Sequence, residues 1–324
     1  MTSPAHLDTA LDAGKTTTKA KKPGFSGIPR KDLSWRRVEI DALDLAGLRA
    51  AIIGGTGGLG RSLALQLSSR GADVIVVGQT FRDPDVRGLR FVQADLSLMS
   101  DARRVGRELP AEQLDLVVFT TGIFAAPRRE ETVEGLERDL AVSYLSRLVL
   151  VRELAARLGR NRASSPWSKT LPRPRVFIMG FPGTNQTGTL DDLNAERGYD
   201  AMPVHMNTVA GNEALVLDAA RRAPDVDFFG LNPGLVKTNI RANFLGQGSL
   251  KHRLAEFFIG LLMISATKYG KRTVPLLVAP ELSGRAPAMF NQKGVAIEAS
   301  AVMTPSHVGE YMRASEDLLA RKIG

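Results

Sequence analysis

An apolar segment that runs into a glycine-rich turn constrains the fold of this chain more than any other feature. Residues 48–53 are Leu, Arg, Ala, Ala, Ile and Ile, which predicts a buried strand, and a helix is expected after the turn. Gly54, Gly58 and Gly60 have the spacing that brings backbone close to a pyrophosphate and packs a helix tightly on a strand. Free N–H groups at the start of that helix would face the phosphates, and the helix dipole favours their negative charge.

The rest of the chain alternates between strand-like and helix-like segments. Apolar segments predict strands at Asp73–Val77, Leu89–Val92, Leu114–Phe119, Val176–Met179, Asp227–Leu231 and Ala288–Phe290. Helical periodicity predicts helices at Leu59–Arg70, Val133–Leu158, Asn207–Arg222 and Val308–Lys322. Strands separated by helices pair in parallel through right-handed crossovers. The sequence therefore predicts an α/β fold: a Rossmann-type, doubly wound parallel sheet in a three-layer αβα arrangement.

Composition divides the chain and limits its partners. Residues 1–30 are poor in large apolar side chains, which predicts a flexible basic tail before a single domain over residues 31–324. The absence of cysteine excludes disulfides and thiolate metal sites, no other metal site is predicted, and a reducing, cytoplasmic location is expected. The net charge of +9 comes from basic residues mixed with acidic ones, which favours an anionic cofactor over nucleic acid. No apolar run is long enough to span a bilayer, so any membrane contact would be peripheral.

Several motifs together resemble the short-chain dehydrogenase/reductase family, and most of all its retinol-dehydrogenase and WW-domain-oxidoreductase branch. They are the glycine turn, the pair Asp95 and Leu96, the segment Asn232-Pro233-Gly234, and the order of the strands. The resemblance covers about Leu48 to Leu319 and implies an NAD(P)-dependent oxidoreductase. The cofactor contacts that it implies are Gly54, Thr56, Gly57, Gly58, Leu59, Gly60, Asp95, Leu96, Gly122, Pro233, Gly234 and Thr238. For Asp95 and Thr238, a helix cap is the alternative interpretation.

The residues after the second predicted strand bear on the type of cofactor. NAD-dependent enzymes need an acid there to bind the ribose 2′-hydroxyl. This chain has no acid between Val77 and Asp83, and a 2′-phosphate would therefore not be repelled. Gln79, Thr80 and Arg82 offer donors for such a phosphate. NADP is therefore favoured over NAD.

The residue types that carry out catalysis in this family are substituted here. The family uses a Tyr for proton transfer, a Lys four residues later, a Ser that holds the substrate oxygen, and an Asn that positions a water. Counting back from Asn232 puts His205 at the Tyr position and Val209 at the Lys position. The Ser position falls at Phe181, or at Gly180 if the register slips by one, and the Asn position falls at Ser143. His205 and Ser143 are the candidate catalytic residues, because imidazole is a competent acid or base near neutral pH. A histidine merely tolerated at a helix start is the alternative for His205.

Three functions are compatible with this pattern. The first is an oxidoreductase with an atypical active site, acting on a carbonyl or alcohol of an apolar small molecule. The second is a non-catalytic nucleotide-binding pseudoenzyme with an interaction or regulatory role, and the third is a non-redox isomerase or cyclase. An apolar lid over about residues 240–275 would suit an apolar ligand, although a buried helix or a subunit interface would look the same. The resemblance also implies a homo-oligomer formed through helices 133–158 and 207–222.

Overall fold

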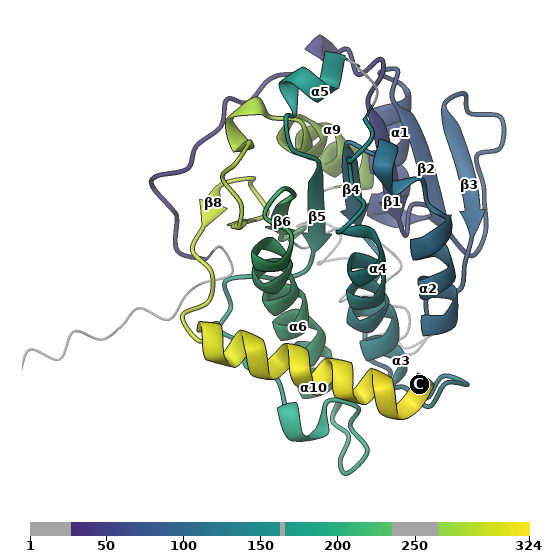
Figure 1. Ribbon diagram of the computed structural model, residues 1–324, viewed down its shortest axis with the longest axis vertical. Helices are drawn as coiled ribbons and strands as arrows, with labels where there is room; N and C mark the ends of the chain where they lie inside the picture. Colours follow the sequence, from purple (N-terminus) through teal and green to yellow (C-terminus); the bar gives the residue numbers. More distant parts are fainter. Residues whose placement is uncertain (1–26, 163–165, 235–264) are drawn as a thin grey trace, which may run out of the picture.

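An eight-stranded sheet forms the centre of the computed structural model, which describes residues 27–162, 166–234 and 265–324 (Figure 1). The strand order is β3-β2-β1-β4-β5-β6-β7-β8, and all neighbours pair in parallel except β7 and β8. The strands are β1 (Arg49–Ile53), β2 (Asp73–Gly78), β3 (Leu89–Gln93), β4 (Leu116–Phe119), β5 (Arg175–Met179), β6 (Asp227–Leu231), β7 (Ala288–Phe290) and β8 (Ala296–Ile297). This order confirms the predicted doubly wound α/β fold.

The central strands are buried on both faces, as a parallel sheet between two helix layers requires. All residues of β4, β5 and β6 are buried. Alternate residues of a strand contribute to two separate apolar cores, so that Ile52 of β1 packs on one side of the sheet and Ile53 on the other. This is why the strands read as continuous apolar runs in the sequence rather than as an alternation of apolar and polar residues.

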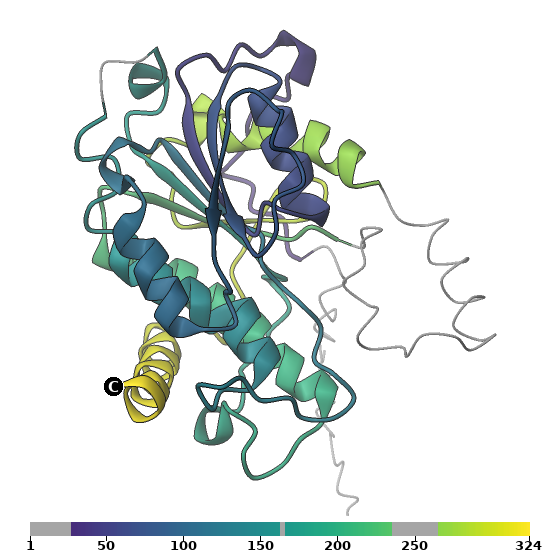
Figure 2. The same cartoon turned by 90° about the vertical axis from the view of Figure 1, so that its right-hand side faces the viewer.

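Helices cover both faces of the sheet (Figures 1 and 2). One face carries α1 (Gly58–Ser68) and α9 (Ala266–Leu277), which pack against each other. The other face carries α2 (Met99–Glu108), α3 (Arg138–Leu140), α4 (Ser146–Leu154) and α6 (Ala201–Arg222), and the short α5 (Pro166–Thr170) precedes β5. Single-turn 3-10 helices lie at Ile40–Ala42, Ala111–Gln113, Leu190–Asp192 and Pro280–Leu282.

The last helix, α10 (Pro305–Ile323), lies across α4 and α6 (Figure 1). Tyr311 donates its hydroxyl to the carbonyl of Asn207 at 2.6 Å, and the hydroxyls of Ser315 and Tyr144 are 2.8 Å apart. The face through which the resemblance implies subunit contacts is therefore packed against a helix of the same chain.

Three helix starts lie three or more residues from those predicted, and that of α10 is at Pro305 rather than Val308. The helix predicted from Val133 begins at Arg138, because residues around Gly135, with a φ of +75°, form a turn closed by a hydrogen bond from Thr132 N to Leu136 O at 2.8 Å. Helix α6 begins at Ala201 rather than near Asn207, since the Asp200 carboxylate caps it by accepting from Met202 N at 3.2 Å.

An irregular segment follows α3. Residues Ala141–Leu145 form a π-helical turn between α3 and α4. Such turns insert an extra residue into a helix and are frequent at functional sites. The candidate residue Ser143 lies at the centre of this turn.

The structure describes only parts of the predicted tail and of the predicted lid. Arg30 N donates to Ala296 O at 2.9 Å and Glu298 N donates to Ile28 O at 2.8 Å, so part of the segment predicted as tail pairs with β8. Of the predicted lid, residues 240–264 lie outside the described residues, and the remainder belongs to α9, where Ser62 Oγ of α1 donates to Ala266 O at 2.8 Å. In the described parts of the chain, no helix combines the length and apolarity that a membrane crossing needs.

Candidate functional site

The glycine turn between β1 and α1 packs against the loop that follows β4. Gly54 has a φ of +88°, and a Cβ atom there would lie 2.6 Å from Thr121 N. A Cβ atom on Gly60 would overlap the carbonyl oxygen of Gly54 and the hydroxyl of Thr120. Both positions therefore require glycine for close packing, and Gly54 requires it also for its left-handed backbone conformation.

The start of α1 is open and positively polarised. Gly57 is the N-cap and supplies no side-chain cap, and a Cβ atom on Gly57 would meet nothing within 4 Å. Gly58 has a φ of +50°, and Leu59 packs its side chain on the core. Thr56 lies over the end of β2, because a Cβ atom on Gly78 would be 2.6 Å from its hydroxyl. These residues fit a pyrophosphate, since the first N–H groups of an uncapped helix attract an anion.

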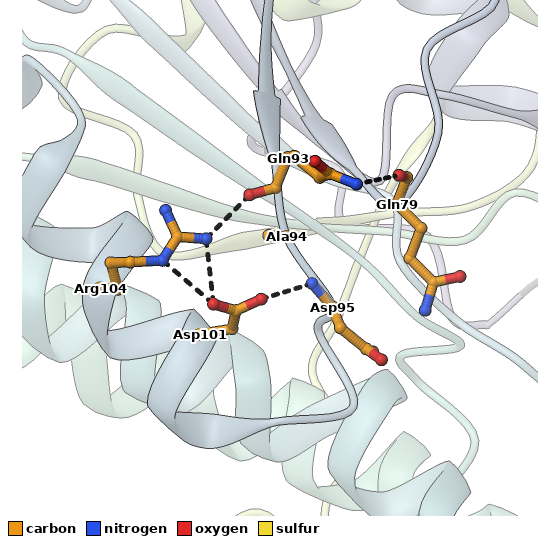
Figure 3. Close-up of a pocket in the computed structure, with 6 residues that line it drawn as sticks. All are labelled: Gln79, Gln93, Ala94, Asp95, Asp101 and Arg104. Atoms are coloured by element: carbon orange, nitrogen blue, oxygen red, sulfur yellow. Dashed lines mark hydrogen bonds and ion pairs between the residues drawn. The ribbon is translucent and has the colours of Figure 1, made fainter.

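An open pocket of about 650 Å³ lies at the carboxyl ends of β2 and β3 (Figure 3). It is lined by Gln79, Gln93, Ala94, Asp95, Asp101 and Arg104. Hydrogen bonds fix its shape: Gln93 Nε2 donates to Gln79 O at 3.3 Å, and Asp95 N donates to Asp101 Oδ2 at 2.7 Å. Its position at this edge of the sheet is that expected for the adenosine half of a dinucleotide.

Both predicted residues after β3 are ordered by local contacts. Oδ1 of Asp95 accepts hydrogen bonds from Ser97 N at 2.9 Å and Ser97 Oγ at 2.7 Å in a turn that precedes α2. The N-cap of α2 is Leu98, so Asp95 is not the helix cap weighed as the alternative. Burial opposes ionisation of Asp95, but the hydrogen bonds from Ser97 and Gln79 and the charge of Arg138 together outweigh it and lower its pKa. Leu96 is buried in the core, so a contact with a cofactor would come from its backbone.

Asp83, the first acid after the end of β2, forms an ion pair with Arg61. Arg61 Nε of α1 lies 2.8 Å from Asp83 Oδ2, and Arg61 binds both carboxylate oxygens of the buried Asp83. This hydrogen-bonded ion pair lowers the pKa of Asp83. Gln79, Thr80 and Arg82 are exposed. The loop thus presents amide, hydroxyl and guanidinium groups, while its carboxylate is engaged elsewhere.

The remaining predicted cofactor residues lie in the loops after β4 and β6. Gly122 stands between Thr121 and Ile123, both of which are held by side chains from the segment around α4. Gly234 has a φ of +71° and follows the half-buried Pro233, and its N–H donates to Asn232 Oδ1 at 2.8 Å. Thr238 lies outside the described residues.

The two candidate catalytic residues, His205 and Ser143, both contact the carboxylate of Asp139. His205 Nδ1 lies 2.7 Å from Asp139 Oδ2, and Ser143 Oγ donates to Asp139 Oδ1 at 2.5 Å. Ser143 Oγ also accepts from Ile123 N at 3.0 Å, which ties this cluster to the loop after β4. The aromatic ring of Phe124 stacks on the imidazole with centroids 4.3 Å apart. His205 is therefore oriented by a hydrogen bond at one ring nitrogen and by a ring contact at its face.

The carboxylates near His205 are buried, and burial opposes their ionisation. Asp139 is 1% exposed, whereas the His205 side chain retains 15% exposure. Burial raises the pKa of the nearby Glu137 to about 7, although Leu140 N donates to that carboxyl, and the charge of Asp139 adds to the rise. The site thus places the buried carboxylate of Asp139 against one partly accessible imidazole.

The other positions predicted to be substituted offer no side-chain group for proton transfer. Val209 is buried and apolar, and Phe181 and Gly180 bring no side-chain hydroxyl. Thr184, a further hydroxyl near the end of β5, donates to Phe181 O at 3.0 Å. Because Ser143 donates to Asp139, its hydroxyl acts on that carboxylate rather than on a substrate oxygen.

Sequence reasoning did not find Asp139 or Phe124. Asp139 precedes Ser143 by four residues, the spacing that places two side chains on one helix face, so a search for an acid one turn from Ser143 would have found it. Phe124 gives no such signal, since its contact with His205 joins the β4 loop to α6.

Comparisons with known proteins identify the family. No family model matches the chain. The chain is 47% identical over 295 residues to an uncharacterized oxidoreductase of Saccharomyces cerevisiae, covering 90% of this chain and 94% of that protein. It is 28% identical over 255 residues to the polyprenol dehydrogenase of Mus musculus, with 72% of each chain covered. The solved structure of a short chain dehydrogenase/reductase family protein superposes with a TM-score of 0.53 at 20% identity, over 81% of this chain and 100% of that one.

The chain therefore belongs to the short-chain dehydrogenase/reductase family and is related to oxidoreductases over nearly its whole length. This confirms the resemblance to the family, while the branch within the family and the substituted catalytic residues stay predictions.

Proposed function

We propose that this protein is an NADP(H)-dependent oxidoreductase that interconverts a carbonyl and an alcohol on an apolar small molecule, with His205 as the proton-transfer group. The observation that carries the proposal is the contact of His205 Nδ1 with the buried carboxylate of Asp139 at 2.7 Å. A histidine merely tolerated at a helix start would not need a buried acid aligned with its ring.

The roles of the two residues follow from hydrogen-bonding capacity. A carboxylate only accepts hydrogen bonds, so the proton of the neutral ring lies on Nδ1 and Nε2 remains the basic nitrogen. A bound nicotinamide cofactor would supply the hydride to the carbonyl carbon in reduction and accept it from the alcohol carbon in oxidation. His205 then gives a proton from Nε2 to the carbonyl oxygen in reduction, and takes it from the hydroxyl in oxidation. Asp139 stabilises the imidazolium form, and Ser143 holds Asp139 in place.

Electrostatics at the end of β2 support NADP. Asp83, the first acid after the strand, is bound by Arg61, and the exposed Arg82 adds a cation to the loop. A 2′-phosphate is favoured by such surroundings because charge-assisted hydrogen bonds to phosphate are strong.

The substrate class follows from a relative of this chain. A relative whose name is polyprenol dehydrogenase supports an apolar alcohol or ketone as substrate. We expect the protein in the cytoplasm. Because α10 packs on α4 and α6, a homo-oligomer would form through another face.

Replacement of His205 tests the proposal. His205→Ala should lower kcat with NADPH and apolar ketones by about 10²–10⁴-fold, the usual contribution of a general acid. The affinity for NADPH should not change, because the residues proposed to bind it are intact. His307→Ala is the matched control. The imidazole of His307 lies on α10 and contacts Thr187 O rather than Asp139. Equal turnover by His205→Ala and His307→Ala would remove His205 from the reaction.

A further inference from the structure

A buried guanidinium joins the carboxyl ends of β4 and β5. Arg147 on α4 is 3% exposed. It donates to the carbonyl oxygens of Thr121, just after β4, and Met179, the last residue of β5. It also donates from Nη1 to Asn212 Oδ1 of α6 at 2.8 Å. One side chain thus connects two strand ends with two helices.

The surroundings of this cation are unusual. The three groups to which it donates are neutral, and the carboxylate that acts on its charge is that of Asp139. Burial lowers the pKa of Arg147 to about 9, which still leaves it charged at neutral pH. A buried ion costs several kcal/mol in lost hydration, and an apolar side chain of similar size would avoid that cost. The hydrogen bonds to backbone are therefore what distinguishes arginine from an apolar residue at this position.

The contacts of Arg147 act on the same loop as those of Ser143. Arg147 binds the carbonyl of Thr121, and Ser143, four residues earlier, accepts from Ile123 N at 3.0 Å. These two bonds hold the residues on either side of Gly122. From the opposite direction, Thr120 N and Thr121 N donate to Ile53 O at 2.8 and 3.2 Å. The loop of residues 120–124 is thus fixed between the strand that leads into the glycine turn and α4.

Asn212 completes the connection to the acid–base cluster. Its Nδ2 donates to Ser143 O at 2.9 Å, while its Oδ1 accepts from Arg147. A continuous series of hydrogen bonds therefore runs from Thr121 through Arg147, Asn212 and Ser143 to Asp139.

We propose that Arg147 is a positioning residue that holds the loop of residues 120–124 against the glycine turn and thereby sets the affinity of the site for the nicotinamide cofactor. The second part rests on the proposed function, because it requires that the cofactor lie along this loop. The first part concerns the protein without cofactor and stands on the hydrogen bonds alone.

The test compares Arg147→Met, Arg147→Lys and Arg152→Met. Methionine keeps the length of the side chain and removes its donors, and lysine keeps the charge but not the planar fork that reaches two carbonyls. Arg152→Met is the matched control: it removes a cation from the same helix, but one that binds Glu316 and Asp218. Hydrogen–deuterium exchange on the cofactor-free protein reports on residues 120–124, and NADPH titration by fluorescence reports on affinity.

Arg147→Met should speed exchange in the segment 120–124 selectively and weaken NADPH binding on the order of tenfold, as expected for the loss of one charge-assisted hydrogen bond. Arg147→Lys should restore part of both, whereas Arg152→Met should change neither. If Arg147→Met does not fold, the comparison of Arg147→Lys with Arg152→Met decides in the same way.

The outcomes separate the two proposals. Exchange in residues 120–124 that is equal in the Arg147 variants and in Arg152→Met would overturn the positioning role, even if thermal stability falls. Faster exchange with unchanged NADPH affinity would overturn the link to the cofactor. If the unaltered protein binds no NADPH, the proposed function fails, while the exchange data still decide whether Arg147 holds the loop.

Discussion

The contact between Asp139 and His205 makes a quantitative prediction for Asp139→Asn. Asparagine has almost the same shape, so the packing around α3 should persist, but it carries no charge and presents an NH₂ group. The carboxylate now accepts hydrogen bonds at 2.5 Å from Ser143 and at 2.7 Å from His205. The amide oxygen can satisfy only one of these donors with a short bond, and the amide NH₂ would favour the histidine tautomer whose Nδ1 accepts.

The loss can be estimated from the charge-assisted bond to the imidazolium. Hydrogen bonds to charged groups contribute about 1.5–3 kcal/mol. Because this bond strengthens only as His205 becomes charged, its loss should appear in kcat as a decrease of about 10- to 200-fold. KM for NADPH should remain within about twofold, since Asp139 touches none of the residues proposed to bind the cofactor.

The assay is steady-state NADPH oxidation with apolar ketones, together with nitrogen NMR of histidine-labelled protein. The chain has four histidines, so the Nδ1 resonance of His205 can be assigned by comparison with His205→Ala. Asp317→Asn, at an exposed carboxylate on α10, is the control for the substitution itself. A folded Asp139→Asn protein with unchanged kcat and an unchanged His205 spectrum would refute the reasoning.

Three further predictions concern stability and cofactor choice. The pKa of Glu137 is about 7 in the folded protein and 4.5 in an exposed carboxyl, so the folded state binds this proton more tightly and loses stability as the pH rises through that interval. Glu137→Gln should therefore gain about 3 kcal/mol relative to the unaltered protein at pH 8 and little at pH 4, as measured by urea unfolding; equal effects at both pH values would contradict this. Gly60→Ala should destabilise the fold by about 1–3 kcal/mol because its Cβ overlaps Gly54 O, whereas Gly57→Ala, which meets no neighbour, should cost about 1 kcal/mol or less in thermal melts. Arg82→Ala should weaken NADPH binding about tenfold and leave NADH binding unchanged in a calorimetric titration, and a parallel loss of both would show that Arg82 does not contact a 2′-phosphate.

The sheet could be predicted closely because its strands are continuous apolar runs. Strand β6 has the predicted limits Asp227–Leu231, and β2 extends only one residue beyond the prediction. Helix starts were harder to predict, since they depend on single caps and turns. The carboxylate of Asp200 and the turn at Gly135 moved two of them by several residues.

In the candidate site, too, local motifs could be predicted from the sequence, whereas contacts between distant residues could not. The glycine turn and the residues after β2 and β3 are local motifs, and each acts within a few residues of sequence. The contact between Asp139 and His205 joins residues 66 positions apart and depends on how α3 packs against α6. Arg147 reaches Thr121 across 26 positions and Asn212 across 65. Such contacts follow from the fold and have no signature in a single sequence.

Binding of the reduced cofactors to purified protein and to His205→Ala tests the central claim most directly. Titration by fluorescence or heat should show micromolar binding of NADPH, tighter than that of NADH, and the same affinity in both proteins. Absence of binding to either cofactor would contradict the assignment of the glycine turn, of the pocket at the ends of β2 and β3, and of hydride transfer as the reaction.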